Sequence, residues 1–423
     1  MNRAILGMFL FTAAAAPTSA WTDEVPALLD QLNAALKAQD YAAAEVDAGK
    51  LLMLKPAYPR YEYELAVARA HQGKVDGSIA ALDTLADMGV LIDVEQEPAF
   101  APLKKAAAWP DLAAKFAELG KPVGHAAPAF HLDEPDFIPE GIARDPKTGD
   151  FFVGSAHLRK IMRVHTGKAT PFADQGAGLW SAMGMKVDSK SGSLWVATCA
   201  LPETAGFDAS LKGKSALLRF DLGTGQLIAS YVPPDTDEHQ FNDVALGPDG
   251  SVYVADGSGG VYMLAGGARA LKLLTPAGAL HSAQGMVASA DGKLLYISDY
   301  TGGLFAYRFK DTSLIHLTAA DGIYSYYVDG LALHGRDLVA TQNAANPQRL
   351  VYFRLDDSGL KIWGSQVLLA SDPQVPEPTL FTLSGDDLYL VANAQWSRFD
   401  DKGNLPSKDQ LQQPLVVKVA LPH

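Results

Sequence analysis

The chain has 423 residues, of which 35 are basic and 48 acidic, so its formal net charge is −13 at pH 7. This acidic balance, without any polybasic run, argues against binding to nucleic acid or to anionic membrane surfaces. Cys199 is the single cysteine, which excludes an intramolecular disulfide, and the stability of the fold must therefore come from a packed apolar core.

The first 20 residues are typical of a secretory signal peptide. Arg3 gives a positive start, Ala4–Ala16 an apolar stretch, and Thr18–Ala20 a small-residue cleavage site before Trp21. The apolar stretch is shorter than the ~20 residues that a membrane-spanning helix needs, and no later stretch qualifies. We therefore expect a secreted or periplasmic mature protein without a membrane span.

Residues 21–120 are rich in alanine, leucine and charged residues at helical spacing. Residues 25–56 predict one antiparallel helix pair, and residues 58–90 predict a second pair that turns at Gly73. Shorter helices over residues 97–116 would cap the array. The two pairs resemble tetratricopeptide repeats, although the usual tryptophan is absent. A helical packing module and a module that docks a protein partner both remain open.

From residue 138 onward, one sequence pattern recurs. PEGIARDPKTGDFFVGS at Pro139–Ser155 returns as FNDVALGPDGSVYVAD at Phe241–Asp256 and AQGMVASADGKLLYISD at Ala283–Asp299, with a looser copy at Val328–Asn343. Each copy predicts an apolar strand, an Asp/Gly turn and a second strand rich in aromatic and β-branched residues. A period of ~40–50 residues with this content is typical of the blades of a β-propeller.

The number of blades follows from the residue that starts each copy. The candidate starting positions are Glu140, Met183, Asn242, Gln284, Asp329 and Glu377, with spacings of 43, 59, 42, 45 and 48 residues. The long interval contains an insertion of 14 residues, Ala200–Gly213, without which it would be 45. We predict an all-β propeller of six four-stranded blades over residues 138–423. A strand in the linker, residues 121–137, is expected to close the ring beside the C-terminal strand PLVVKVALP.

In a propeller, the innermost strands begin near the axis on one face, here called the top face. The loops between second and third strands emerge there as well. The polar starting residues, with Asp243, should therefore meet a second set of loop residues. The first set is Glu140, Asn242, Asp243, Gln284, Asp329 and Glu377. The second is His157, Arg159, the insertion Ala200–Gly213, Asp256, Asp299, Tyr300, Asn343, Asn346, Asn393 and Trp396. Carboxylates in one narrow funnel are costly unless a cation neutralises them, and an all-oxygen donor set suits Ca²⁺. A solvated channel without metal, with Asn and Asp serving in turns, remains the alternative.

Four of the starting motifs carry a resemblance. PEG at Pro139–Gly141, FND at Phe241–Asp243, AQG at Ala283–Gly285 and VDG at Val328–Gly330 resemble the gluconolactonase and senescence-marker-protein family of six-bladed propellers. That family binds one divalent cation, commonly calcium, at these positions through a glutamate, two asparagines and an aspartate. The resemblance implies four metal ligands here: Glu140, Asn242, Gln284 and Asp329. Gln284 replaces the second asparagine, and Gln240 replaces an arginine that holds the substrate in many members.

The resemblance implies a calcium-dependent hydrolase that acts on a lactone or small ester. Asp329 is the expected general base, and His157, otherwise a surface-loop residue, is the second candidate. Six residues are expected to contact the substrate: Gln240, Asp243, Asp299, Tyr300, Asn343 and Trp396. The chain has no G-x-S-x-G motif to suggest a covalent serine route.

Two non-catalytic hypotheses compete with the hydrolase. In one, the protein binds a ligand or a partner in the cell envelope through the top face and the helical repeats. In the other, it is an assembly factor whose top face docks a peptide against Trp180, Tyr300 and Trp396. The fold alone does not separate these hypotheses, because propellers host many functions.

Overall fold

The computed structural model describes residues 21–422, and side chains from Glu24 onward. The chain forms two compact units. One consists of the residues up to Lys121 with two short later segments, Ala319–Tyr324 and Ala344–Pro347, and the other of the remaining residues. The predicted signal peptide, residues 1–20, lies outside the described residues. Within residues 21–422, no helix is long and apolar enough to cross a membrane.

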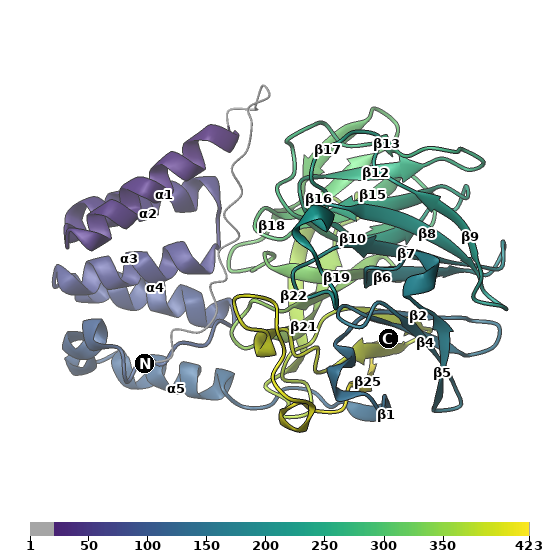
Figure 1. The fold of residues 1–423 in the computed structure, drawn as a ribbon. Helices are drawn as coiled ribbons and strands as arrows, with labels where there is room; N and C mark the ends of the chain where they lie inside the picture. Colours follow the sequence, from purple (N-terminus) through teal and green to yellow (C-terminus); the bar gives the residue numbers. More distant parts are fainter. Residues whose placement is uncertain (1–20, 423) are drawn as a thin grey trace. The chain divides into compact units, whose positions relative to one another are not determined.

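The first unit is built from helices (Figure 1). In chain order these are α1 (Trp21–Lys37), α2 (Tyr41–Leu54), α3 (Pro59–His71), α4 (Val75–Asp87), the 3₁₀ helix η1 (Pro98–Lys105) and α5 (Trp109–Leu119). The Asp40 side chain caps α2 by accepting a hydrogen bond from the Ala43 N–H at 3.0 Å. Gly73, with a φ of 70°, makes the tight turn between α3 and α4. The helical region is confirmed, whereas its likeness to tetratricopeptide repeats stays a prediction.

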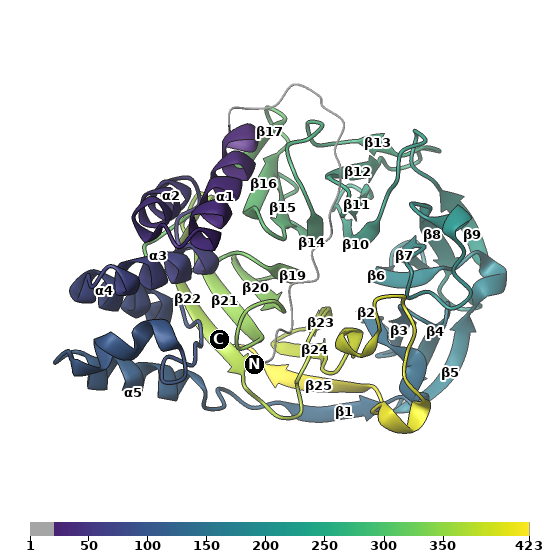
Figure 2. The same cartoon turned by 60° about the vertical axis from the view of Figure 1, so that its left-hand side comes forward.

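The second unit is a six-bladed propeller, as predicted (Figure 2). Blade one holds β2 (Pro139–Arg144), β3 (Phe151–Ser155), β4 (Ile161–His165) and β5 (Lys168–Ala173). Blade two holds β6 (Ser181–Asp188), β7 (Ser193–Cys199), β8 (Ser215–Asp221) and β9 (Leu227–Tyr231). Blade three holds β10 (Phe241–Leu246), β11 (Val252–Asp256), β12 (Gly260–Leu264) and β13 (Lys272–Leu273). In each of these three blades the strands pair in chain order, with the first strand innermost.

The remaining blades complete the ring. Blade four holds β14 (Ala283–Ala288), β15 (Leu294–Asp299), β16 (Gly303–Arg308) and β17 (Ser313–His316). Blade five holds β19 (Val328–His334), β20 (Asp337–Gln342), β21 (Arg349–Leu355) and β22 (Lys361–Ala370), and adds a fifth strand, β18 (Thr318–Ala319), beside β22. Blade six holds β23 (Phe381–Ser384), β24 (Asp387–Val391), β25 (Leu415–Ala420) and β1 (Ala127–His131).

The ring closes in the sixth blade, where strands from both ends of the propeller sequence share a sheet. β1 pairs antiparallel with β25, with His131 opposite Leu415. The innermost strands contact one another in the order β2, β6, β10, β14, β19, β23, and β23 returns to β2. Closure removes the exposed sheet edges that a linear array of blades would leave at its two ends.

The apolar core of the propeller lies between neighbouring blades. Phe152 of blade one and Phe220 of blade two share one buried cluster, and Tyr253 and Leu295 join blades three and four in another. Tyr352 and Leu388 do the same for blades five and six. Because this packing between blades buries the apolar faces, polar side chains can occupy the start of each inner strand.

Candidate metal and active site

Five of the six inner strands share one irregularity at their start. Each has a register shift of the β-bulge type: between Pro139 and Ile142, Ala182 and Met185, Phe241 and Val244, Ala283 and Met286, and Val328 and Leu331. The two residues inside each bulge are Glu140–Gly141, Met183–Gly184, Asn242–Asp243, Gln284–Gly285 and Asp329–Gly330. A bulge leaves residues unpaired and re-aims their side chains. The four predicted metal ligands therefore occupy equivalent places in four blades.

The glycine of these motifs is required by the close approach of the next blade. A Cβ on Gly141 would lie 1.9 Å from the Met183 carbonyl oxygen, and one on Gly285 would lie 2.2 Å from the Asp329 carbonyl oxygen. In blade three this position is occupied by Asp243. Its carboxylate has room because the residue that faces it on β6 is Gly184, whose Cβ, if present, would lie 2.1 Å from Asp243 Oδ1. The FND motif thus places a carboxylate where the other bulges have glycine.

The sixth blade corrects one predicted starting position. In blade six Phe381 pairs with Leu390, and in blade five Leu331 pairs with Ala340 at the same place in the hairpin. Asp329 lies two residues before Leu331, so the equivalent residue of blade six is Thr379, two residues before Phe381, and not Glu377. The Glu377 carboxylate accepts hydrogen bonds from the backbone N–H and the hydroxyl of Ser397, both at 3.0 Å. Two prolines and the absence of the Gly motif make this copy hard to align from sequence.

Three buried carboxyl groups of the site repel one another. Burial, and then the charge of Asp329, raise the pKa of Glu140 well above its ordinary value. Burial, and then the charge of Asp243, raise the pKa of Asp329 to about 7. Burial also raises the pKa of Asp243, opposed by Lys186, whose Nζ lies 3.8 Å from Asp243 Oδ1. A positive charge bound among these groups would relieve the repulsion.

The amide side chains of the site are oriented by hydrogen bonds. Asn242 donates from Nδ2 to the Ala283 carbonyl at 3.0 Å, and its Oδ1 accepts from Gln240 Nε2 at 3.1 Å. Gln284 donates from Nε2 to the Ser282 hydroxyl at 3.2 Å. A ligand could therefore bind to the Gln284 amide oxygen and to the second lone pair of Asn242 Oδ1.

The residue types at these positions, carboxylates and amides, are those that bind a hard cation. Among residues 24–422, no three His, Cys, Asp or Glu side chains gather in a way that could hold a metal, so a cation here would need amide oxygens besides Glu140 and Asp329. Asp243 Oδ1 is buried and accepts no hydrogen bond from any described residue. A set of carboxylate and amide oxygens is the donor chemistry that Ca²⁺ prefers.

Three of the residues expected to contact the substrate bond to the carboxylates or to one another. Trp396 Nε1 donates to Glu140 Oε2 at 2.7 Å. Asn343 Nδ2 donates to Asp329 Oδ2 at 2.7 Å, and the Tyr300 hydroxyl donates to Asn343 Oδ1 at 2.7 Å. These contacts join the loops of blades four, five and six to the two carboxylates.

Asp299 and His157 have other partners. The Asp299 carboxylate accepts from the backbone N–H groups of His281 and Gly302, at 2.6 and 3.0 Å, so it holds the chain that enters β14. His157 Nδ1 donates to the Glu203 carbonyl of the insertion, because a carbonyl oxygen can only accept.

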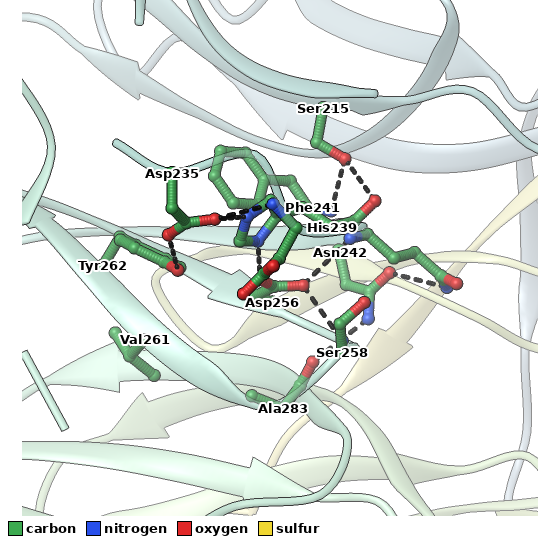
Figure 3. A network of polar contacts seen from close by, with 12 residues as sticks. Ser215, Asp235, His239, Phe241, Asn242, Asp256, Ser258, Val261, Tyr262 and Ala283 are labelled. Atoms are coloured by element: carbon green, nitrogen blue, oxygen red, sulfur yellow. Dashed lines mark hydrogen bonds and ion pairs between the residues drawn. The ribbon is translucent and has the colours of Figure 1, made fainter. Parts of the chain in front are cut away.

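A charged network that sequence reasoning missed supports the strand of Asn242 (Figure 3). His239 lies between Asp256 Oδ2, 2.6 Å from Nδ1, and Asp235 Oδ1, 2.7 Å from Nε2. Burial alone would lower the pKa of His239, but the two carboxylates outweigh it and raise the pKa to about 8. Asp256 Oδ1 also accepts from the Gln240 N–H at 2.9 Å. The network thus fixes the backbone just ahead of Asn242.

A residue with strained backbone dihedral angles stands directly before each of the two strands that carry Glu140 and Asp329. Ile138 has a φ of 47° and Tyr327 a φ of 56°, and each lies two residues before the carboxylate. The left-handed region is unfavourable for a β-branched or aromatic residue, and such strain persists only where the surroundings impose it. Because this left-handed conformation recurs before both carboxylates, we infer that the backbone there helps to orient the Glu140 and Asp329 side chains.

No protein-family model and no curated protein matches this chain. Among solved structures, it is similar to a gluconolactonase from Xanthomonas campestris, at 16% identity and a TM-score of 0.47, over 71% of this chain and 99% of that one. It is also similar to the calcium-binding protein regucalcin from Agrobacterium tumefaciens, at 14% identity and a TM-score of 0.45, over 70% and 96% of the two chains. A glucose dehydrogenase matches at 12% identity and a TM-score of 0.47, over 69% and 99%. Likeness at this level concerns the fold alone.

Proposed function

We propose that the propeller is a divalent-cation-dependent hydrolase of a lactone or small ester, with calcium as the first candidate metal. One observation carries the proposal. Glu140 and Asp329 occupy equivalent bulges on the inner strands, where both are buried and repel each other. Asn242 occupies a third such bulge, and its side-chain amide is oriented by one hydrogen bond to Oδ1 and one from Nδ2. A cation resolves this repulsion, and its charge can serve acyl chemistry.

Four residues would hold the cation: Glu140, Asn242, Gln284 and Asp329. When bound, it would polarise the carbonyl of the substrate and stabilise the negative charge that develops on that oxygen. Asp329, oriented through its Oδ2 by Asn343, would take a proton from the attacking water at Oδ1. Gln240, a neutral amide beside Asn242, would bond to a polar group of the substrate.

Steady-state hydrolysis tests this proposal. The chelated protein should turn over a lactone such as δ-gluconolactone, or the ester p-nitrophenyl acetate, only after CaCl₂ is added. Asp329→Ala should abolish turnover, while the matched control Asp401→Ala, at an exposed aspartate, should keep it. Calcium binding without hydrolysis of any lactone or ester would refute the hydrolase and leave a binding protein. Failure to bind calcium would refute the metal site as well.

We also propose that the chain is exported, supported by the charged, apolar and small-residue pattern of residues 1–20. N-terminal sequencing of the protein recovered from the periplasm or medium should begin at Trp21. Recovery only from the cytosol, with Met1 or Asn2 as the first residue, would contradict export.

A further inference from the structure

Each of the two carboxylates proposed as metal ligands, Glu140 and Asp329, receives an N–H from a neutral side chain on a loop. Trp396 Nε1 bonds to Glu140, and Asn343 Nδ2 bonds to Asp329, both at 2.7 Å. A neutral donor orients a carboxylate without cancelling its charge, so the carboxylate keeps its attraction for a cation. An arginine or lysine at the same place would instead compete with the metal.

Tyr300 determines which way the Asn343 amide points. The Tyr300 hydroxyl donates to Asn343 Oδ1 at 2.7 Å, which leaves Nδ2 directed at Asp329 Oδ2. With the amide reversed, the oxygen of Asn343 would face the carboxylate of Asp329, and both would be acceptors. Because the Tyr300 phenol offers a proton, it favours the orientation that presents an N–H to Asp329.

Tyr300 also holds the backbone that leads to Asp329. Its carbonyl accepts from the Tyr327 N–H at 2.7 Å, and its own N–H donates to the Ser282 carbonyl at 2.9 Å. The rings of Tyr300 and Tyr327 lie 5.5 Å apart, at an interplanar angle of 60°. Tyr327 is the left-handed residue two positions before Asp329. Tyr300 thus reaches Asp329 both through the main chain and through Asn343.

We propose that Asn343 and Tyr300 are positioning residues. Through the chain of hydrogen bonds Tyr300–Asn343–Asp329, they hold the Asp329 carboxylate in the orientation that binds a divalent cation, and they do not contact the substrate. This inference rests on the proposed function, and it replaces the role in substrate contact expected from the sequence. Loss of a group that orients a metal ligand typically costs ~10–100-fold in metal affinity or activity.

Calorimetric titration of the chelated full chain with CaCl₂ alone tests the proposal without substrate. Tyr300→Phe removes a single oxygen and keeps the ring against Tyr327, so it should fold normally and bind Ca²⁺ ~10-fold more weakly. Asn343→Ala should weaken binding at least as much. The control Tyr231→Phe, at a half-buried tyrosine on β9, should bind as the wild type does. In hydrolysis at saturating Ca²⁺, both site variants should lower kcat with KM little changed.

Several outcomes decide the matter. Unchanged Ca²⁺ affinity in Tyr300→Phe, with or without a raised KM, would overturn the positioning role, and a raised KM would restore substrate contact. If the wild type binds Ca²⁺ but hydrolyses nothing, the proposed function fails alone, and weaker Ca²⁺ binding by Tyr300→Phe still supports the positioning role. A wild type that binds no Ca²⁺ overturns both proposals. If Asn343→Ala does not fold, the milder Tyr300→Phe decides.

Discussion

Deprotonation of His239 should destabilise the propeller, because the imidazolium is hydrogen-bonded to two carboxylates at once. Asp256 and Asp235 take its two N–H groups, at 2.6 and 2.7 Å, while the Tyr262 hydroxyl lies 3.5 Å from Asp235 Oδ2. A neutral imidazole has one N–H and can donate to only one of these carboxylates. The other carboxylate then faces a nitrogen lone pair, so raising the pH should break one of the two bonds.

The magnitude follows from the pKa of the folded state. Hydrogen bonds to Asp256 and Asp235 overcome the effect of burial and raise the pKa of His239 from 6.5 to about 8. Since the folded pKa is the higher one, the stabilisation is fully present below pH 6.5 and is lost as the pH rises through 8. At ~1.36 kcal/mol per pKa unit, a shift of this size is worth roughly 2 kcal/mol. His239 is only 8% exposed and the Asp256 side chain only 2%, so solvent screens their bond little. The Asp235 side chain is 43% exposed, so its bond is screened more and roughly 2 kcal/mol is an upper value.

Urea unfolding at pH 6 and pH 9.5, for the wild type and for His239→Gln, measures this contribution. Because the chain has two compact units, its unfolding need not follow a single transition. His239→Gln leaves the helical unit unchanged, so the difference in unfolding free energy between wild type and variant cancels the contribution of that unit. Between the two pH values, the wild type should lose roughly 2 kcal/mol more than the variant. An NMR titration of the His239 imidazole should give a midpoint near 8.

Equal pH dependence of the free energy of unfolding in the wild type and His239→Gln would refute this reasoning. So would an imidazole that titrates at or below 6.5, since the two carboxylates would then exert no net effect. The control His125→Gln changes an exposed histidine of the same unit and should keep the pH dependence of the wild type.

Two further predictions concern the ring itself. Gly184→Ala should destabilise the propeller by ~1–3 kcal/mol or more, seen as a lower Tm, because its Cβ would lie 2.1 Å from Asp243 Oδ1. Gly364→Ala, whose nearest neighbour would be Arg354 Cβ at 3.8 Å, should change stability by less than ~0.5 kcal/mol, and equal effects would contradict the close approach of the inner strands. Burial raises the pKa of the Cys199 thiol, so a thiol reagent at pH 8 should modify Cys199 only in unfolded protein, and rapid labelling of the native state would contradict its burial.

The propeller could be predicted from sequence because a blade is a local unit. Its strands follow one another along the chain, so the period of the starting positions and the Asp/Gly turns are visible without any tertiary information. The same locality revealed the insertion Ala200–Gly213, which lies between β7 and β8 in the structure. The sixth blade was misjudged at Glu377, where the motif lacks its glycine and only the strand register aligns Thr379 with Asp329.

The sequence by itself determined which residue types stand at equivalent places: Glu140, Asn242, Gln284 and Asp329 each begin a copy of the same motif. Only the tertiary structure decided what these side chains bond to. Trp396 and Glu140 are 256 residues apart, and Tyr300 reaches Asp329 through a residue of another blade. A repeat is a property of neighbouring residues, whereas a hydrogen bond across blades exists only once the ring has closed. For this reason the donors to the two carboxylates, and the His239 network, could not be predicted from the pattern.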